Sequence, residues 1–199
     1  MLIKLVKFNL FCLLLVAGEL IGNNASAQEP IFNEQLCLLN VELISEPTNK
    51  TQRIDLNKEV AMVLTNAVAV NKNLGIHIAS NTTCQQMLGA SYTGSKAEWA
   101  NFFDSALTGL LKAGFKELQL TLVGENDKIF NSPLTKTLIA KEYVFTGEIG
   151  DNKQIIKNLA LLDKTNNTIY TFSVSGNVAS KEGIIKEYKR LLVSIKLAE

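Results

Sequence analysis

SKAEWANFFDSALTGLLKAG, residues 95–114, is the part of the chain whose pattern decides the fold. Ser95 and Glu98 fit a capping box, in which each side chain accepts a hydrogen bond from a backbone N–H of the first helical turn. Gly114 stands where a helix that ends in the left-handed conformation needs a glycine. Between them, apolar side chains recur every three or four residues at Trp99, Phe102, Phe103, Ala106, Leu107, Leu110 and Leu111. The stretch therefore predicts an amphipathic helix whose apolar stripe is core and packs on a sheet.

The sequence after this helix predicts an antiparallel meander. Strands are expected at residues 118–123, 138–147, 153–163 and 168–175, with turns at 124–127 and 165–167. Leu118, Leu120 and Leu122 alternate, as on one face of a strand. The Asn residues at 166 and 167 tolerate the positive φ that tight connections require. We expect the helix to pack on the first and the last of these strands.

A second helix is expected at the end of the chain, with Ser180 as its N-cap. Its apolar stripe is Ile184, Ile185, Tyr188, Leu191, Leu192 and Ile195. The charged residues are expected to point mostly outward, and these are Lys181, Glu182, Lys186, Glu187, Lys189 and Arg190. Helix, strands and helix in this order predict an α+β fold, an antiparallel sheet meander with helices packed on one face. Residues 28–199 form a single globular domain in this interpretation.

The part of the chain before residue 95 has weaker patterns. Expected there are a helical turn or strand at 36–45, a loop at 46–53, a helix at 56–68, a strand at 74–79 and a short helix at 82–90. Pro47, Thr48 and Asn49 favour the loop. The spacing of apolar residues favours the helix at 56–68, although its β-branched content leaves a strand pair open.

The first 27 residues have the three parts of a secretory signal peptide. Lys4 and Lys7 precede the apolar run LFCLLLVA at residues 10–17, and Ala25-Ser26-Ala27 is an A-x-A cleavage site. The run is shorter than the roughly 20 residues that span a bilayer, so no membrane span is expected after cleavage. The mature chain should begin at Gln28 and be periplasmic or secreted; an uncleaved anchor is the alternative.

Export determines what the three cysteines predict. Cys12 lies inside the apolar run and leaves with the signal, so only Cys37 and Cys84 remain. Two cysteines in an oxidising compartment predict one disulfide. Such a bond would stabilise the fold by about 4 kcal/mol on the chain-entropy model. Two separate buried thiols are the alternative.

The charge balance excludes one class of partner. The chain has 20 basic and 19 acidic residues, and cleavage would leave 18 of each. No run of five or more Lys or Arg occurs, so nucleic acid is not an expected partner.

Residues that could carry catalysis or bind metal are sparse. His77 is the single histidine, and the sequence has no G-x-S-x-G, H-E-x-x-H, G-x-x-x-x-G-K-[ST] or C-x-x-C motif. Glu142, Glu148 and Asp151 could supply paired carboxylates or a Ca²⁺ site, but a solvated hairpin edge is the simpler interpretation. We therefore expect no catalytic residue, no cofactor and no metal.

The second half of the chain resembles a known family. Residues 95–196 combine a helix containing Trp99, a meander, the ending NTIYTFSVS at 167–175 and a helix that closes in LLVSI at 191–195. This order is similar to the PsbP/Mog1-like α/β/α sandwich family. The resemblance implies a non-enzymatic envelope protein and names no ligand.

These observations favour an exported binding or accessory protein that acts through protein–protein contacts. An immunity protein against a periplasmic effector is a specialised form of the same hypothesis. A subunit of an envelope assembly would show a large exposed apolar patch. An enzyme with a site built from scattered Ser, Asp, Glu or Lys would show a pocket lined by convergent ionisable groups.

Overall fold

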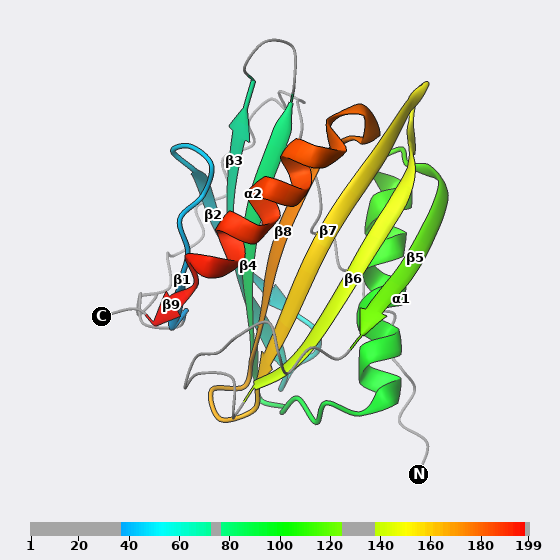
Figure 1. Cartoon of the computed structure of the whole chain (residues 1–199). Coiled ribbons are helices and arrows are strands. Elements are labelled where there is room, and N and C mark those ends of the chain that lie inside the picture. Colours follow the sequence, from blue (N-terminus) through cyan, green and yellow to red (C-terminus); the bar gives the residue numbers. More distant parts are fainter. Residues whose placement is uncertain (1–36, 73–76, 125–137, 198–199) are drawn as a thin grey trace, which may run out of the picture.

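The computed structural model describes residues 37–72, 77–124 and 138–197. The predicted signal peptide and all of the predicted turn at 124–127 except Gly124 lie outside these residues. Figure 1 shows an antiparallel sheet with two long helices, which confirms the α+β class.

Within the described residues, seven strands form the main sheet, in the order β2-β3-β4-β8-β7-β6-β5, and every pair is antiparallel. The strands are β2 (Thr48–Asp55), β3 (Ala61–Asn71), β4 (Ile78–Leu88), β5 (Lys116–Gly124), β6 (Leu138–Ile149), β7 (Asn152–Asp163) and β8 (Thr168–Asn177). A separate short pair joins β1 (Leu39–Asn40) to β9 (Lys196–Leu197). The helices are α1 (Lys96–Lys112), the one-turn η4 (Val178–Ser180) and α2 (Lys181–Val193).

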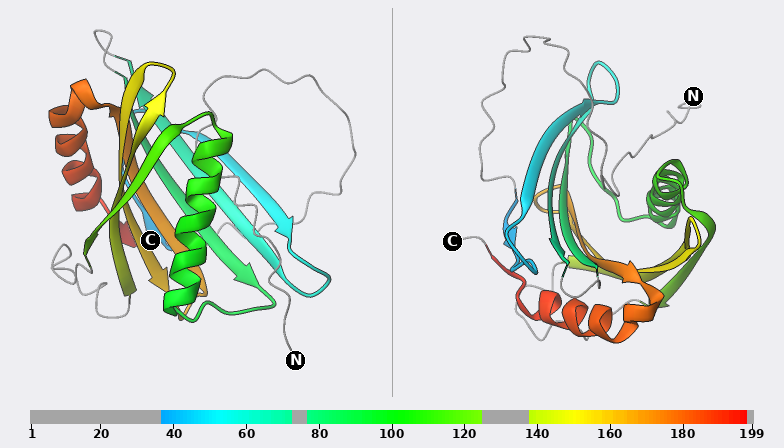
Figure 2. Two further views of the ribbon diagram at one scale, coloured as in Figure 1. Left: turned by 90° about the vertical axis from the view of Figure 1, so that its right-hand side faces the viewer. Right: turned by 90° about the horizontal axis from the view of Figure 1, so that it is seen from above.

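The two helices lie on opposite faces of the sheet, and the expectation of one shared face is wrong. The sheet is curved, with α1 inside the curve and α2 outside it (Figure 2). In β7, Leu159 and Leu161 pack in the cluster under α2, whereas Ala160 and Leu162 pack in the cluster under α1. Successive apolar residues in this strand are needed because both of its faces are buried.

The start of α1 confirms the predicted cap with one change. Ser95 Oγ accepts a hydrogen bond from the Glu98 N–H at 3.2 Å. The Glu98 carboxylate accepts from the N–H groups of Thr93 and Gly94, at 2.9 and 2.6 Å, rather than from that of Ser95. The acidic residue thus fixes the chain that enters the helix.

The end of α1 is the predicted glycine cap. Gly114 has φ +90°. The N–H of Gly114 bonds to the Leu111 carbonyl and that of Phe115 to the Leu110 carbonyl, each at 3.1 Å. These two bonds define a Schellman motif, which turns the chain directly into β5.

The predicted stripe of α1 is core. Trp99, Phe103, Ala106 and Leu110 are buried, while Leu111, at its edge, is 57% exposed. The cluster under α1 includes Leu118 and Leu120 of β5, Ile169 of β8, and Tyr143, Phe145 and Ile156 between them. Packing on the first and last strands of the meander is therefore confirmed, whereas Leu122 is 58% exposed.

The strands β6, β7 and β8 confirm the predicted meander, whereas the region before residue 95 follows prediction only in part: β1 lies within 36–45, and β4 begins at the end of the predicted strand 74–79, of which residues 74–76 lie outside the described residues. The expected loop at 46–53 is mostly β2, the expected helix at 56–68 is largely the strand β3, and the expected helix at 82–90 is the end of β4. Residues 61–64 are all buried, so both faces of β3 are covered and its apolar spacing is not that of a one-faced helix. The open strand alternative for this region is the correct one.

The entry to α2 also differs in its chemistry. Ser180 occupies the N-cap position but makes no side-chain cap bond. Asn177 instead caps the preceding η4, because its side-chain oxygen accepts from the Ala179 N–H at 2.8 Å.

Candidate functional site

Residues 37–47, here called the strap, cross the outer face of the curved sheet beside α2. The Cys37–Cys84 disulfide, with its Cα atoms 6.0 Å apart, ties the start of the strap to β4 and confirms the predicted bond. The β1–β9 pair joins the strap to the chain just after α2.

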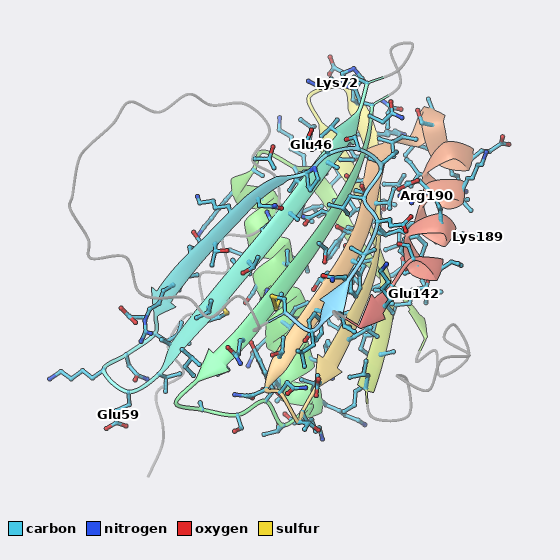
Figure 3. All side chains as sticks on the ribbon, turned by 90° about the vertical axis from the view of Figure 1, so that its left-hand side faces the viewer. Glu46, Glu59, Lys72, Glu142, Lys189 and Arg190 are labelled. Carbon is cyan, nitrogen blue, oxygen red and sulfur yellow. A yellow bond between two sulfur atoms is a disulfide. The ribbon has the colours of Figure 1, made fainter. Side chains whose placement is uncertain are left out.

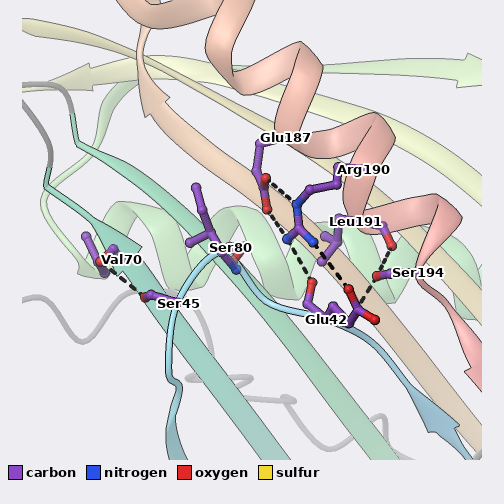
Figure 4. Close-up of polar contacts among 9 residues, drawn as sticks. Glu42, Ser45, Val70, Ser80, Glu187, Arg190, Leu191 and Ser194 are labelled. Atoms are coloured by element: carbon purple, nitrogen blue, oxygen red, sulfur yellow. Dashed lines mark hydrogen bonds and ion pairs between the residues drawn. The ribbon is translucent and has the colours of Figure 1, made fainter.

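Arg190 of α2 holds the middle of the strap (Figure 4). Its Nε and Nη2 donate to the two oxygens of Glu187, each at 2.7 Å, and Nη2 also donates to the Glu42 carbonyl at 2.9 Å. The Glu42 N–H donates to Ser194 Oγ at 3.0 Å. The bonds to Glu187 raise the pKa of Arg190. Glu187 was expected to point outward, but its side chain is only 8% exposed and is the acidic partner of this contact.

Three further bonds hold the strap to the sheet. Near its start, the Leu38 N–H donates to the Tyr170 hydroxyl at 3.2 Å. Near its end, the Ile44 N–H donates to Ser80 Oγ at 2.9 Å, and Ser45 Oγ donates to the Val70 carbonyl at 3.4 Å. The strap is thus fixed along its length by contacts to α2, β3, β4 and β8.

A groove of about 590 Å³ lies between the strap and the outer faces of β2, β3 and β4. Its walls are apolar side chains of the strap and β3, hydroxyls of Thr51, Thr65 and Thr82, the disulfide and Tyr170. No Asp, Glu, Lys, Arg or His is among the described residues that line it. The charged residues Glu46, Glu59 and Lys72 lie around this face near the ends of strands (Figure 3).

The candidate carboxylates from the sequence do not form one site. Glu142 is buried on β6 and lies against Tyr188 of α2, whose pKa is raised by burial and by the Glu142 charge. Glu148 pairs across β6 and β7 with Lys153, beside the turn that carries the exposed Asp151. Glu142 and Glu148 are six positions apart on one strand, about 20 Å.

The part of the chain that the structure describes contains no cluster of side chains suited to metal binding or imidazole catalysis. No group of three or more His, Cys, Asp or Glu side chains there could hold a metal ion. His77 is exposed and directly precedes β4.

A second, smaller cavity of about 100 Å³ lies between α1 and the inner face of the sheet. Tyr92, Glu98, Asn101 and Ser105 are among its lining residues. The Glu98 carboxylate already accepts the bonds that fix the start of α1. Burial raises the pKa of Tyr92, which therefore stays a neutral phenol. This cavity offers no free acid–base pair.

No protein-family model, no curated protein and no solved structure matches the chain. Among the described residues, no helix combines the length and the apolar content needed to cross a bilayer.

Proposed function

We propose that the protein is an exported, non-enzymatic binding protein, periplasmic or secreted, that acts through contact with another protein at the groove beneath the strap. Export is inferred from residues 1–27 and is supported by the Cys37–Cys84 disulfide, since such bonds persist in oxidising compartments.

The observation that carries this proposal is the uncharged lining of the groove. General acid–base and nucleophilic catalysis need ionisable side chains that converge on one point. The groove offers hydroxyls, amides and apolar surface instead, which suit recognition of an uncharged surface. An immunity protein that neutralises a periplasmic effector would be one instance of this class.

The strap supports the proposal because it makes the groove rigid before anything binds. A disulfide at its start and the Arg190 contacts in its middle restrict its movement. A preformed wall lowers the conformational entropy that binding would otherwise cost.

Site-specific photo-crosslinking in the native cells tests the proposal. A photoreactive residue replaces Asn49, which lines the groove, and in a matched control it replaces Lys189, which is exposed on α2. We expect a protease-sensitive adduct of discrete mass from position 49 and none of that mass from position 189.

Two outcomes would overturn the proposal. Equal adducts from both positions, or none from position 49, would remove the groove as the site. An adduct that resists protease would show that the occupant is not a protein.

A further inference from the structure

We propose, on the basis of the binding function above, that the occupant of the groove is an extended peptide segment of the partner that adds to β2 as a further strand. β2 ends the strand order of the main sheet, and among the described residues its ladder partner is β3. All eight of its residues pair in unbroken register, from Thr48 opposite Val68 to Asp55 opposite Ala61. An edge of this kind is a template for another strand.

The register identifies the main-chain groups that point outward from β2. The hairpin closes with a bond from the Leu56 N–H to the Val60 carbonyl at 2.9 Å. Hydrogen-bonded and non-hydrogen-bonded pairs alternate along an antiparallel ladder. The N–H and C=O groups of Asn49, Thr51 and Arg53 therefore point away from β3. The Thr51–Thr65 hydroxyl contact at 3.1 Å agrees, because side chains are closer in non-hydrogen-bonded pairs.

The same residues connect the free edge with the groove. Asn49 and Thr51 turn their side chains into the groove while their main-chain groups face outward. A strand added here would place every second side chain over the groove. Because the lining has no charge, these side chains must be uncharged, since an unpaired charge there would lose hydration without gaining a partner.

The charge of β2 defines the rest of the partner segment. Lys50 lies on the opposite face from Thr51 and is exposed. Arg53 forms an ion pair with Asp55 at 3.0 Å. An acidic side chain opposite Lys50 would complement its charge. The partner segment therefore has uncharged residues at every second position, over the groove, and at least one Asp or Glu on its other face. A second copy of β2 would repeat the excess positive charge, which disfavours pairing between copies.

The test uses a displayed library of random ten-residue peptides and the oxidised protein from residue 28. Thr51→Pro removes an outward N–H, and an edge strand tolerates proline at such a position. Thr51→Val keeps the N–H and removes only the hydroxyl. We expect enriched peptides with uncharged residues at alternate positions and at least one Asp or Glu among the remaining ones. Their affinity should fall about ten-fold or more with Thr51→Pro and change little with Thr51→Val.

Hydrogen exchange provides a second measurement on the unmodified protein. Bound peptide should slow exchange of the Asn49, Thr51 and Arg53 amides. The Lys50 and Gln52 amides point toward β3 and should change little. Absence of enriched peptides, equal binding to Thr51→Pro, or no added protection would overturn strand addition. A groove-specific protein adduct from position 49 would still leave the binding function standing, so the two failures are distinguishable.

Discussion

At the scale of single residues, Arg190 and Glu187 link two separate parts of the chain. Glu187 is nearly buried, and a carboxylate in that position needs a cation and hydrogen-bond donors. Arg190 supplies both through a two-pronged contact, and it reaches Glu42 of the strap with the same guanidinium group. One side chain therefore both satisfies a buried charge and holds a wall of the groove.

Replacing Arg190 by Met should lower the free energy of unfolding by about 2 kcal/mol, because charged hydrogen bonds are lost and Glu187 stays buried. Chemical denaturation with two-state fitting measures the change. Lys189→Met, at an exposed neighbour on the same helix, should change stability by less than about 0.5 kcal/mol. Equal effects of the two substitutions would show that the Arg190 contacts do not stabilise the strap.

The four tyrosines make a prediction for alkaline pH. Burial is the largest cause that raises the pKa of Tyr92, Tyr143, Tyr170 and Tyr188 above the ordinary value of 10.0. Above about pH 10 the unfolded chain releases these protons while the folded chain keeps them. Stability is therefore fully present below pH 10 and falls as pH rises beyond it.

Parallel recording of phenolate absorbance and circular dichroism measures this. Phenolate should appear together with loss of the dichroism signal, in one cooperative transition. Growth of phenolate absorbance in a protein that keeps its native dichroism would contradict the burial of these side chains.

At the scale of elements, α1 is held by its aromatic side chains. The Phe103 ring lies 5.0 Å from that of Tyr143 and 6.0 Å from that of Trp99, centroid to centroid. Phe103→Ala should cost about 3–5 kcal/mol in denaturant melts. Leu111→Ala, on the exposed edge of the same helix, should cost less than about 0.5 kcal/mol. A Phe103→Ala protein as stable as its parent would place the stripe against something other than this core.

Elements with local signals could be predicted from the sequence, and elements that depend on distant partners could not. The cap residues and the stripe of α1 are all within one segment, and the Asn residues mark the β7–β8 turn. β2 is exposed along most of its length, so its side chains show little of the burial alternation that identifies a strand. β4 is rich in polar residues, which do not identify a central strand. It lies in the middle of the sheet because β3 and β8 pair with its backbone on both sides.

The groove could not be predicted for a related reason. Its lining comes from the strap, β2, β3, β4 and β8, which are spread between Cys37 and Tyr170 and individually carry no motif. The cysteines were the one signal that connected two of these segments, because pairing Cys37 with Cys84 places the strap against β4. The candidate carboxylates were found from local clustering in the sequence, but Glu142 turned out to be separated from the other two along β6.

At the scale of the whole molecule, the disulfide bears on both the proposed export and the proposed binding site. The bond spans 47 positions and joins the strap to the sheet. The same cross-link therefore forms part of the groove wall in the folded protein and restricts the conformations of the unfolded chain. Loss of a cross-link of this span lowers stability by about 4 kcal/mol on the chain-entropy model. The remaining strap contacts are individually weak bonds, several of them exposed.

The exported protein should therefore begin at Gln28 and carry the Cys37–Cys84 bond. An intact-mass measurement with and without reductant tests both predictions. We expect the mass of residues 28–199 less two hydrogens, and no thiol labelling after unfolding without reductant. Reduction should lower stability by about 4 kcal/mol and weaken crosslinking from position 49, because the strap loses its tie to β4. Cys37→Ala/Cys84→Ala should reproduce both effects without reductant. A retained N-terminal segment would contradict cleavage, whereas unchanged crosslinking after reduction would show that the remaining strap contacts suffice to form the groove.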